Sequence, residues 1–380
     1  MLKRKRQVAA KLESIEGVAE TLAAADAKIL AYDPKVSHDP EIFTRDPVRS
    51  SLSQVGKIIG KRPASLAFKL ELRGSGTKTT DPEWIKLIQA CGFASSALKS
   101  IAIGAIASGP FQHGEIITGG TSHASGRVVF NTVNGDAKIY YVSISTGELA
   151  SGEVLTGSKS AATATTSGTP VSEGKEYRPV SSDASSLTMG SYEDGVLKTI
   201  KGARGTVKFN FKSGQPVMMD FNFQGVEAGI ADTALLASIS HESQKPPALL
   251  SASLLLDAYA ARIGEMNIDI NNNLASRDDI NDSRSILSFL ITGKTISGSL
   301  NPEMVTAATY DFYTKYFANT EAILSFIVGA TTGNKFRFYA PRLQITKLED
   351  DERDGIQLLK VSFDLNGSID GEDDFCFVQL

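Results

Sequence analysis

Histidine and cysteine are the side chains that most often bind metals or act as nucleophiles. The chain of 380 residues has few of them: His38, His113, His123, His241, Cys91 and Cys376. No two histidines are four residues apart, and the cysteines are widely separated, so neither set has the spacing of a zinc site. We therefore predict no metal site. We interpret the cysteines as small buried side chains in a reducing compartment.

Two glycine-rich stretches, at residues 119–122 and 202–205, resemble phosphate-binding loops only in composition. Neither contains Gly-Lys-Ser/Thr, and neither precedes an apolar helix, so both are interpreted as β-turns. The chain also lacks the Gly-x-Ser-x-Gly elbow of serine hydrolases and shows no nucleophile–base pair. We predict no catalytic residues, no bound cofactor and no enzymatic activity.

Charged side chains gather at two places that leave alternatives open. The basic cluster at residues 3–6 is either a solvated terminus or a contact with an acidic partner surface. The acidic run Glu349-Asp350-Asp351-Glu352 lies between two predicted strands and is either an exposed hairpin tip or a site for a cation or a partner. A further acidic stretch, residues 370–374, lacks the spacing of a calcium-binding loop.

The overall charge argues against some classes of protein. The net charge is −4 and the pI is about 5.7, which disfavours nucleic acid as the main ligand. No apolar run reaches the roughly 18 residues that a membrane span requires, so we expect no membrane anchor. The basic start is not followed by an apolar segment, which argues against a signal peptide. We expect a soluble protein that is intracellular when made.

Most of the elements that must position these residues are strands. Residues 206–211 and 217–223 alternate in polarity and flank a short turn, which predicts a β-hairpin. In its second strand, one face is apolar, and Met218, Asp220 and Asn222 lie on the other. Further alternating strands are expected at residues 64–73, 266–271, 294–300, 335–339, 343–345 and 356–365.

Three helices are expected. Val8, Leu12, Ile15 and Val18 have helical spacing, so we expect a helix near the N-terminus, followed by an extended arm with Pro34, Pro40 and Pro47. Asp81-Pro82-Glu83 and Asn301-Pro302-Glu303 each combine a capping residue, a proline and a glutamate. We therefore predict a helix beginning at each of these two places.

Residues 111–180 are rich in Gly, Ser and Thr and contain short alternating strands. Two hexapeptides within them resemble each other, GEIITG at 114–119 and GEVLTG at 152–157. We predict a small all-β module inserted in a loop, with the low-complexity tract 158–167 as its exposed exit.

The order of strand, capped helix, strands and hairpin occurs twice. Pro82 and Pro302 are 302 − 82 = 220 residues apart, whereas Gly225 and Gly367, at the ends of the hairpins, are 367 − 225 = 142 apart. The difference of 78 residues is close to the length of the Gly/Ser/Thr-rich segment. An internal duplication with one insertion accounts for both spacings.

These observations predict a mainly β fold of the sandwich or barrel type with short flanking helices, in the α+β sense. It has two tandem units and an inserted all-β module. The expected divisions are an N-terminal helix and arm at 1–45, a first unit at 46–110 plus 181–230, the module at 111–180, a connector at 231–257, and a second unit at 258–380.

Several phrases resemble the major tail tube proteins of long-tailed (siphovirus-type) bacteriophages and prophages. They are Arg49, the glycine-containing text after Val55, and residues 3–13 (KRKRQVAAKLE), 66–76 (LAFKLELRGSG), 82–93 (PEWIKLIQACGF), 186–195 (SLTMGSYEDG) and 198–205 (KTIKGARG). They cover most of residues 1–225 outside the insert. The second half is similar in architecture more than in wording.

The resemblance implies a β-sandwich whose long hairpins join those of neighbouring subunits into a β-barrel around a lumen. Stacked rings would form a tube through which DNA passes without specific binding. Two tube units per chain imply a trimeric ring rather than the usual hexamer. The expected partners are further copies of the chain and the tape-measure, terminator and distal-tail proteins, in a virion tail made in the host cytoplasm.

Two other functions remain open on the sequence. A distal-tail or tail-terminator ring would share the fold without helical stacking. A carbohydrate- or cell-surface-binding role could reside in the inserted module. Long tubes, single rings or dispersed monomers in electron micrographs would distinguish the three.

Overall fold

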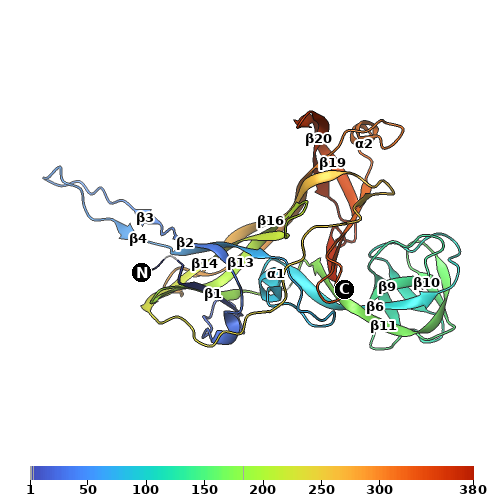
Figure 1. Cartoon of the computed structure of the whole chain (residues 1–380). Helices are drawn as coiled ribbons and strands as arrows, with labels where there is room; N and C mark the ends of the chain where they lie inside the picture. Colours follow the sequence, from blue (N-terminus) through green and yellow to red (C-terminus); the bar gives the residue numbers. More distant parts are fainter. Residues whose placement is uncertain (1, 3, 183) are drawn as a thin grey trace.

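The computed structural model describes residues 2, 4–182 and 184–380. Strands take up 51% of the chain and helices 4%, and all the strand pairs are antiparallel, which confirms the mainly β prediction. Figure 1 shows an elongated molecule. A long sheet lies in the middle, a narrow arm projects from one end, a compact barrel lies at the other, and a hairpin stands away from the sheet.

The strands are β1 (Arg6–Leu12), β2 (Tyr32–His38), β3 (Ile42–Phe43), β4 (Ile58–Ile59), β5 (Pro63–Glu71), β6 (Phe93–Ile103), β7 (Ile116–Gly119), β8 (Ser125–Val128), β9 (Lys138–Ser143), β10 (Val154–Gly157), β11 (Thr163–Pro179), β12 (Leu187–Glu193), β13 (Val196–Lys212), β14 (Met218–Asp232), β15 (Leu255–Leu256), β16 (Ile263–Asp278), β17 (Ile286–Pro302), β18 (Ala322–Val328), β19 (Phe336–Arg353), β20 (Ile356–Leu365) and β21 (Cys376–Gln379). The helices are the 3-10 helix η1 (Ala24–Asp26), α1 (Ile85–Ala90) and α2 (Phe312–Phe317).

The predicted hairpin is the long pair β13–β14. Val217, Met219, Phe221 and Phe223 are buried, whereas Asn222 on the opposite face is exposed. The face assignment from the alternating pattern is therefore confirmed. Burial of these apolar side chains supplies the main driving force for the hairpin, about 2 kcal/mol for each one.

Two sets of six strands have the same order of pairing. The first strand set runs β1–β12–β13–β14–β5–β2, and the second strand set runs β15–β18–β19–β20–β17–β16. Within each set the strands also follow the same order along the chain. The two sets join where β13 pairs with β16. The strands β2, β5, β14, β13, β16, β17, β20 and β19 thus form one continuous run.

One large apolar core is shared by the two strand sets. Phe209, Phe211, Phe326, Phe338 and Phe377 meet there, with ring centroids about 5 Å apart in the closest pairs. The core therefore draws on both strand sets and on β21. Because so much aromatic surface is shared, the two sets stabilise each other.

A smaller closed barrel is built from residues 93–179. The ladder runs β6–β9–β8–β7–β10–β11 and returns to β6, so none of these strands has a free edge along its paired length. Its own core contains Ile101, Phe111, Ile117, Tyr141 and Leu155. The tract 158–167, expected as an exposed exit, instead enters β11, with Ala162 and Ala164 buried.

The N-terminal helix prediction was wrong, because residues 6–12 form strand β1. Val8, Ala9 and Ala10 are all buried, which a one-faced surface helix would not allow. β1 pairs with β12 along its whole length. The gain from completing the β12 edge outweighs a helical spacing that rested on four residues.

The second capped helix begins later than predicted. Asn301 and Pro302 end strand β17, and the Asn301 side chain accepts hydrogen bonds from the backbone of Gly264 and Glu265. The helix α2 starts at Phe312, with Asp311 capping Thr314 at 2.8 Å. Thus the Asn-Pro-Glu pattern closes a strand here, because its asparagine binds the neighbouring strand β16.

The first capped helix is shorter than predicted. The helix α1 begins at Ile85, and the Asp81 carboxylate accepts hydrogen bonds from Ser95 and Tyr177 instead of capping the helix. The expected stop is correct, since Gly92 has a φ of +81°. The strands expected at 335–339 and 343–345 are one strand, β19, which a bulge bends without interrupting.

Candidate functional site: a strand junction and two open edges

The continuous run of eight strands carries a polar face opposite the apolar core. Its members come from six of the strands: Lys69, Glu71, Met218, Asp220, Asn222, Lys208, Asn210, Asn267, Asp269, Asn271, Ser297, Ser299, Ser362 and Asp364. Two lysines and four carboxylates lie on it, with Lys69 Nζ 3.6 Å from Asp220 and Lys208 Nζ 3.9 Å from Asp269. The face is therefore wide and hydrophilic, with a small net negative charge.

The junction of the two strand sets is the antiparallel pair β13–β16. Lys208 lies opposite Asp269, and the pairing continues to Lys212 opposite Glu265. The turn that follows β13 adds a hydrogen bond of 3.0 Å from the Ser213 amide to the Gly264 carbonyl. The end of the β13–β14 hairpin is thus fastened along the beginning of β16.

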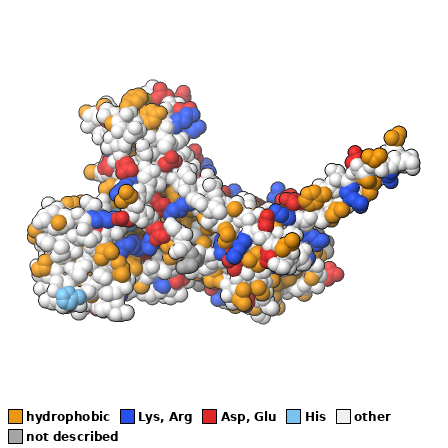
Figure 2. All heavy atoms as spheres, turned by 180° about the vertical axis from the view of Figure 1, so that it is seen from behind, with side chains coloured by type: hydrophobic (Ala, Val, Ile, Leu, Met, Phe, Trp, Pro, Cys, Tyr) orange, Lys and Arg blue, Asp and Glu red, His pale blue; other side chains and the backbone are white. Residues whose placement is uncertain are grey.

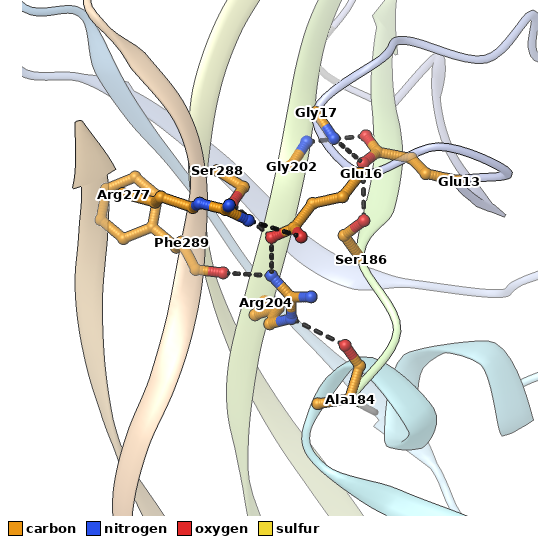
Figure 3. A network of polar contacts seen from close by, with 10 residues as sticks. All are labelled: Glu13, Glu16, Gly17, Ala184, Ser186, Gly202, Arg204, Arg277, Ser288 and Phe289. Atoms are coloured by element: carbon orange, nitrogen blue, oxygen red, sulfur yellow. Dashed lines mark hydrogen bonds and ion pairs between the residues drawn. The ribbon is translucent and has the colours of Figure 1, made fainter. Parts of the chain in front are cut away.

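Glu16 links three parts of the molecule at the other end of this junction (Figure 3). It accepts hydrogen bonds from Arg204 of β13 at 2.8 Å, Ser288 of β17 at 2.5 Å and Arg277 of β16 at 3.2 Å. Arg204 also donates to the carbonyls of Phe289 and Ala184. One carboxylate therefore bridges a cation of the first strand set to a cation of the second.

The electrostatics of Glu16 favour its charged form. Partial burial alone would raise its pKa, but hydrogen bonds from Ser288 and Arg204 and the charges of Arg204 and Arg277 lower it overall. The side chain of Arg204 is only 9% exposed, so its ion pair is screened little by solvent.

Glu13 holds the loop that carries Glu16. Its carboxylate accepts from the amides of Gly17 and Gly202 at 2.8 and 2.7 Å, and from the hydroxyls of Ser186 and Thr188. Gly202 has a φ of +57°, and a Cβ there would lie 2.8 Å from the Leu287 carbonyl oxygen. The close approach of β17 to β13 therefore requires glycine at this point.

An apolar contact seals the junction beside this network. Val226, Ile286 and Phe289 are buried together, with Leu274 packed against them. The end of the β16–β17 hairpin thus docks on the first strand set through both polar and apolar contacts.

The structure places the two charged clusters on exposed surfaces. The acidic run 349–352 is exposed on β19 near the turn of the β19–β20 hairpin, which confirms the hairpin-tip interpretation. Of the basic cluster, Arg4 and Arg6 line a groove of about 630 Å³ that also contains His241. Lys3 lies outside the described residues.

The histidines and cysteines are not brought together. Cys91 and Cys376 are buried and unpaired, and burial raises the pKa of both thiols. His113 is buried, with its pKa lowered by burial. Among the residues that the structure describes, no group of three His, Cys, Asp or Glu side chains could hold a metal ion.

The glycine-rich stretch 119–122 and the loop at 157–160 each have a partner that we did not predict, a buried glutamate. The Glu153 carboxylate accepts hydrogen bonds from the amides of Thr121, Ser122 and Ala150, and Glu115 accepts from the amides of Lys159, Ser160 and Gln112. Each glutamate of the repeated Gly-Glu-x-x-Thr-Gly phrase thus binds the loop after the other copy. The repetition of the glutamate was the signal in the sequence.

In the described part of the chain, no helix is long and apolar enough to cross a membrane.

Taken together, the fold and the junction define a mainly β protein in which the charged groups join strands. A model of the family described as phage tail tube protein matches residues 3–367. The chain therefore belongs to the phage tail tube protein family, as its resemblance implied, and is a structural protein of the virion tail. A comparison with curated proteins found no match.

Proposed function

We propose that this protein is a tail tube subunit that assembles into stacked rings around a lumen that serves as the DNA conduit. The continuous run of eight strands is the single observation that carries this proposal. An extended sheet with a covered apolar face and an open polar face is suited to form part of the wall of a channel.

We infer an internal duplication that makes each chain equivalent to two tube units. The same order of strand pairing in the two strand sets supports it, and so does the recurring Phe-x-(Phe/Leu)-x-Gly phrase that ends at Gly225 and Gly367. Three chains would then supply six similar units, so a trimeric ring is favoured over a hexameric one.

The polar face suits a surface along which DNA must slide. Strong binding to DNA depends on many lysines and arginines that neutralise phosphates. Here Lys69 and Lys208 each lie beside a carboxylate, and Glu71 and Asp364 add further negative charge, so the face carries no net positive charge. The tape-measure, terminator and distal-tail proteins are the other proposed partners, in a tail assembled after synthesis in the host cytoplasm.

We propose that the barrel of residues 93–179 is the inserted module, which was expected at 111–180, and that it projects outward from the ring. It lies at the far end of the molecule from the arm (Figure 1), and its strands pair mostly with one another. Its closed ladder leaves no long edge for a neighbouring subunit.

Electron microscopy of the purified protein tests the proposal. Long hollow tubes are expected, whereas closed single rings would favour a terminator or distal-tail role, and dispersed monomers at every concentration would contradict assembly.

A variant that lacks most of the barrel tests whether the barrel lies at the periphery of the ring. Ser100 and Val171 lie opposite each other, so residues 101–170 can be replaced by an Asn-Gly turn. Tubes should persist, and loss of assembly from a folded variant would contradict the outward placement.

A further inference from the structure

Two strand edges of the eight-strand run are open. Among the described residues, β2 pairs only with β5, which leaves its other edge free. In the described part of the chain, the last part of β19, beyond Leu343, pairs with β20 alone. Open edges of this length readily pair with another chain, and each lies at one end of the run.

The chain itself contains a joint between strands equivalent to these two. β16 pairs with β17 as β2 pairs with β5, and β13 pairs with β14 as β19 pairs with β20. The equivalent strands β13 and β16 are joined along the corresponding edges. The β13–β16 joint is therefore made within the chain. The equivalent joint between β19 and β2 needs a second copy.

We propose that β19 of one copy pairs antiparallel with β2 of the next copy, in the register that β13 and β16 use within the chain. This inference rests on the proposed tube function, and it names the edges, the register and the groove through which a second copy binds.

The register follows from the pairing within each strand set. Lys208 lies opposite Asp220, and Lys347 lies opposite Ser362, the position equivalent to Asp220 when the Gly225 and Gly367 ends are aligned. On the other strand, Asp269 corresponds to Lys35, because their partners on β17 and β5 are equivalent. The Lys208–Asp269 pair thus predicts Lys347 opposite Lys35 of the neighbouring copy.

Two equivalent grooves show what fills the space beside these strands. The groove at the beginning of β16 measures about 270 Å³ and is lined in part by Phe211 and Ser213 from the β13–β14 hairpin. The groove at the beginning of β2, which contains Tyr32 and Pro34, measures about 630 Å³. It has no such hairpin among its lining residues, so it has room for the β19–β20 tip of a second copy.

Charge complementarity favours the same occupant. The groove beside β2 contains Arg4, Arg6 and His241, with Asp33 as the one carboxylate among the described residues that line it. The antiparallel register carries the exposed acidic run 349–352 toward these cations. Glu349 already binds Lys347 at 2.7 Å, which offsets the opposition of Lys347 and Lys35. The two charged clusters of the sequence thus become one interface.

The arm supplies a second contact of the same joint. The β3–β4 arm extends the β2–β5 strand pair. The end of the β16–β17 hairpin extends the β16–β17 strand pair in the same way. That hairpin end buries Ile286 and Phe289 against the first strand set, whereas Ile42, Phe43, Ile58 and Ile59 on the arm are all more than half exposed. Figure 2 shows these hydrophobic patches along the projecting arm.

The counterpart of Arg204 lies ready to receive the arm. Arg342 occupies the position of Arg204 when β19 is aligned with β13, and its side chain is 39% exposed, with Glu321 3.9 Å away. Arg204 binds the Phe289 carbonyl of β17 within the chain. We expect Arg342 to bind a carbonyl of the neighbouring arm in the same manner.

Disulfide trapping tests the register. The double variant K35C/K347C, oxidised in assembled tubes, should give a ladder of covalently linked chains up to a closed ring on non-reducing gels. The native Cys91 and Cys376 are buried, so they add little background. As a matched control, K208C/D269C should form the equivalent bond within one chain, without change in the number of linked chains.

A shifted pair checks specificity. Ser37 lies two residues from Lys35, so S37C/K347C should give at least tenfold less linked product, because the Cα atoms lie too far apart for good disulfide geometry. Tubes that form without a K35C/K347C ladder, or equal linking by the shifted pair, overturn the register and leave the tube function standing. A protein that stays monomeric at every concentration overturns both.

Discussion

Arg204 and Arg342 occupy equivalent places in the two strand sets, but their surroundings differ. Arg204 is almost buried, and it binds Glu16 and two backbone carbonyls, whereas Arg342 is exposed. A buried cation that loses its partners is costly, while an exposed one contributes little. Substitutions at these two arginines therefore distinguish an effect on the stability of one chain from an effect on the assembly of several chains.

Arg204→Ala should destabilise the monomer by about 3 kcal/mol, because it leaves Glu16 without its closest cation. Arg342→Ala should change the free energy of unfolding by less than about 0.5 kcal/mol. Urea unfolding of both variants under monomeric conditions makes the comparison. Equal effects would contradict the role given to the Glu16 network.

Glu153 predicts a dependence of the barrel on pH. Burial would raise its pKa, but hydrogen bonds from the backbone of Ser122 and Ala150 lower it to about 2 from 4.5. Because the folded pKa is depressed, this stabilisation is complete above about pH 4.5 and is lost as the pH falls toward 2. The protection factors of the β7–β10 amides, which compare their exchange with that of an unfolded chain at the same pH, should therefore fall at low pH.

Glu153→Gln should remove most of that pH dependence and destabilise the barrel by about 2 kcal/mol at neutral pH. Glu148→Gln is the matched control, since its side chain is 56% exposed and binds Lys99 alone among the residues that the structure describes. Hydrogen exchange of the barrel strands, measured on both full-length variants, tests whether the effect is specific to Glu153. Identical exchange rates would show that the carboxylate cradle is dispensable.

At the scale of elements, the strands are held together by close backbone contact as much as by side chains. Gly202 lets β17 approach β13, whereas a Cβ added at Gly214, in the turn of the β13–β14 hairpin, would point into open space. Both have positive φ values, +57° and +75°. Any difference between them when a methyl group is added must come from the contact and not from the backbone conformation.

Gly214→Ala should cost about 1 kcal/mol, the penalty of a left-handed conformation. Gly202→Ala should cost clearly more, about 3 kcal/mol, because its Cβ also meets the Leu287 carbonyl and Ser288. Thermal unfolding of the two variants tests this. A smaller loss for Gly202→Ala would mean that β13 and β17 can separate without cost.

At the scale of the whole molecule, each chain contains one complete joint, the β13–β16 pair, and the two open edges of β2 and β19, which would form a second joint with other copies. The acidic run 349–352 and the groove of Arg4 and Arg6 lie on different parts of the same chain, so under the proposed β19–β2 joint they meet between neighbouring copies. Assembly should therefore depend on electrostatic attraction that each monomer leaves unused.

Charge reversal tests this attraction. R4E/R6E should weaken ring formation at least tenfold, as E349K/D351K should, and the quadruple variant should recover much of the loss. Sedimentation velocity at low and high salt is the measurement, and wild-type assembly should weaken as salt rises. Failure of the quadruple variant to recover, with each double variant folded, would contradict the pairing of these clusters.

Much of the fold could be predicted from the alternation of polar and apolar residues. The β13–β14 hairpin, its buried face, the strands β16, β17 and β20, and the β-rich nature of residues 111–180 all follow from period-two patterns. The helices were less predictable. Residues 6–12 are a strand only because β12 offers an edge, and Asn301 ends a strand only because β16 lies beside it.

The candidate site, too, could be predicted from the sequence only in part. The sequence by itself determined that metal and nucleophile patterns are lacking, that two charged clusters exist, and that a hairpin phrase recurs, since these depend on residue types and spacing. Only the tertiary structure decided that Glu16 bridges Arg204 to Arg277, and that in the described part of the chain β2 and the end of β19 each leave one edge open. The physical reason is that strand pairing and ion pairs join residues hundreds of positions apart, and no local pattern records which edge is left open.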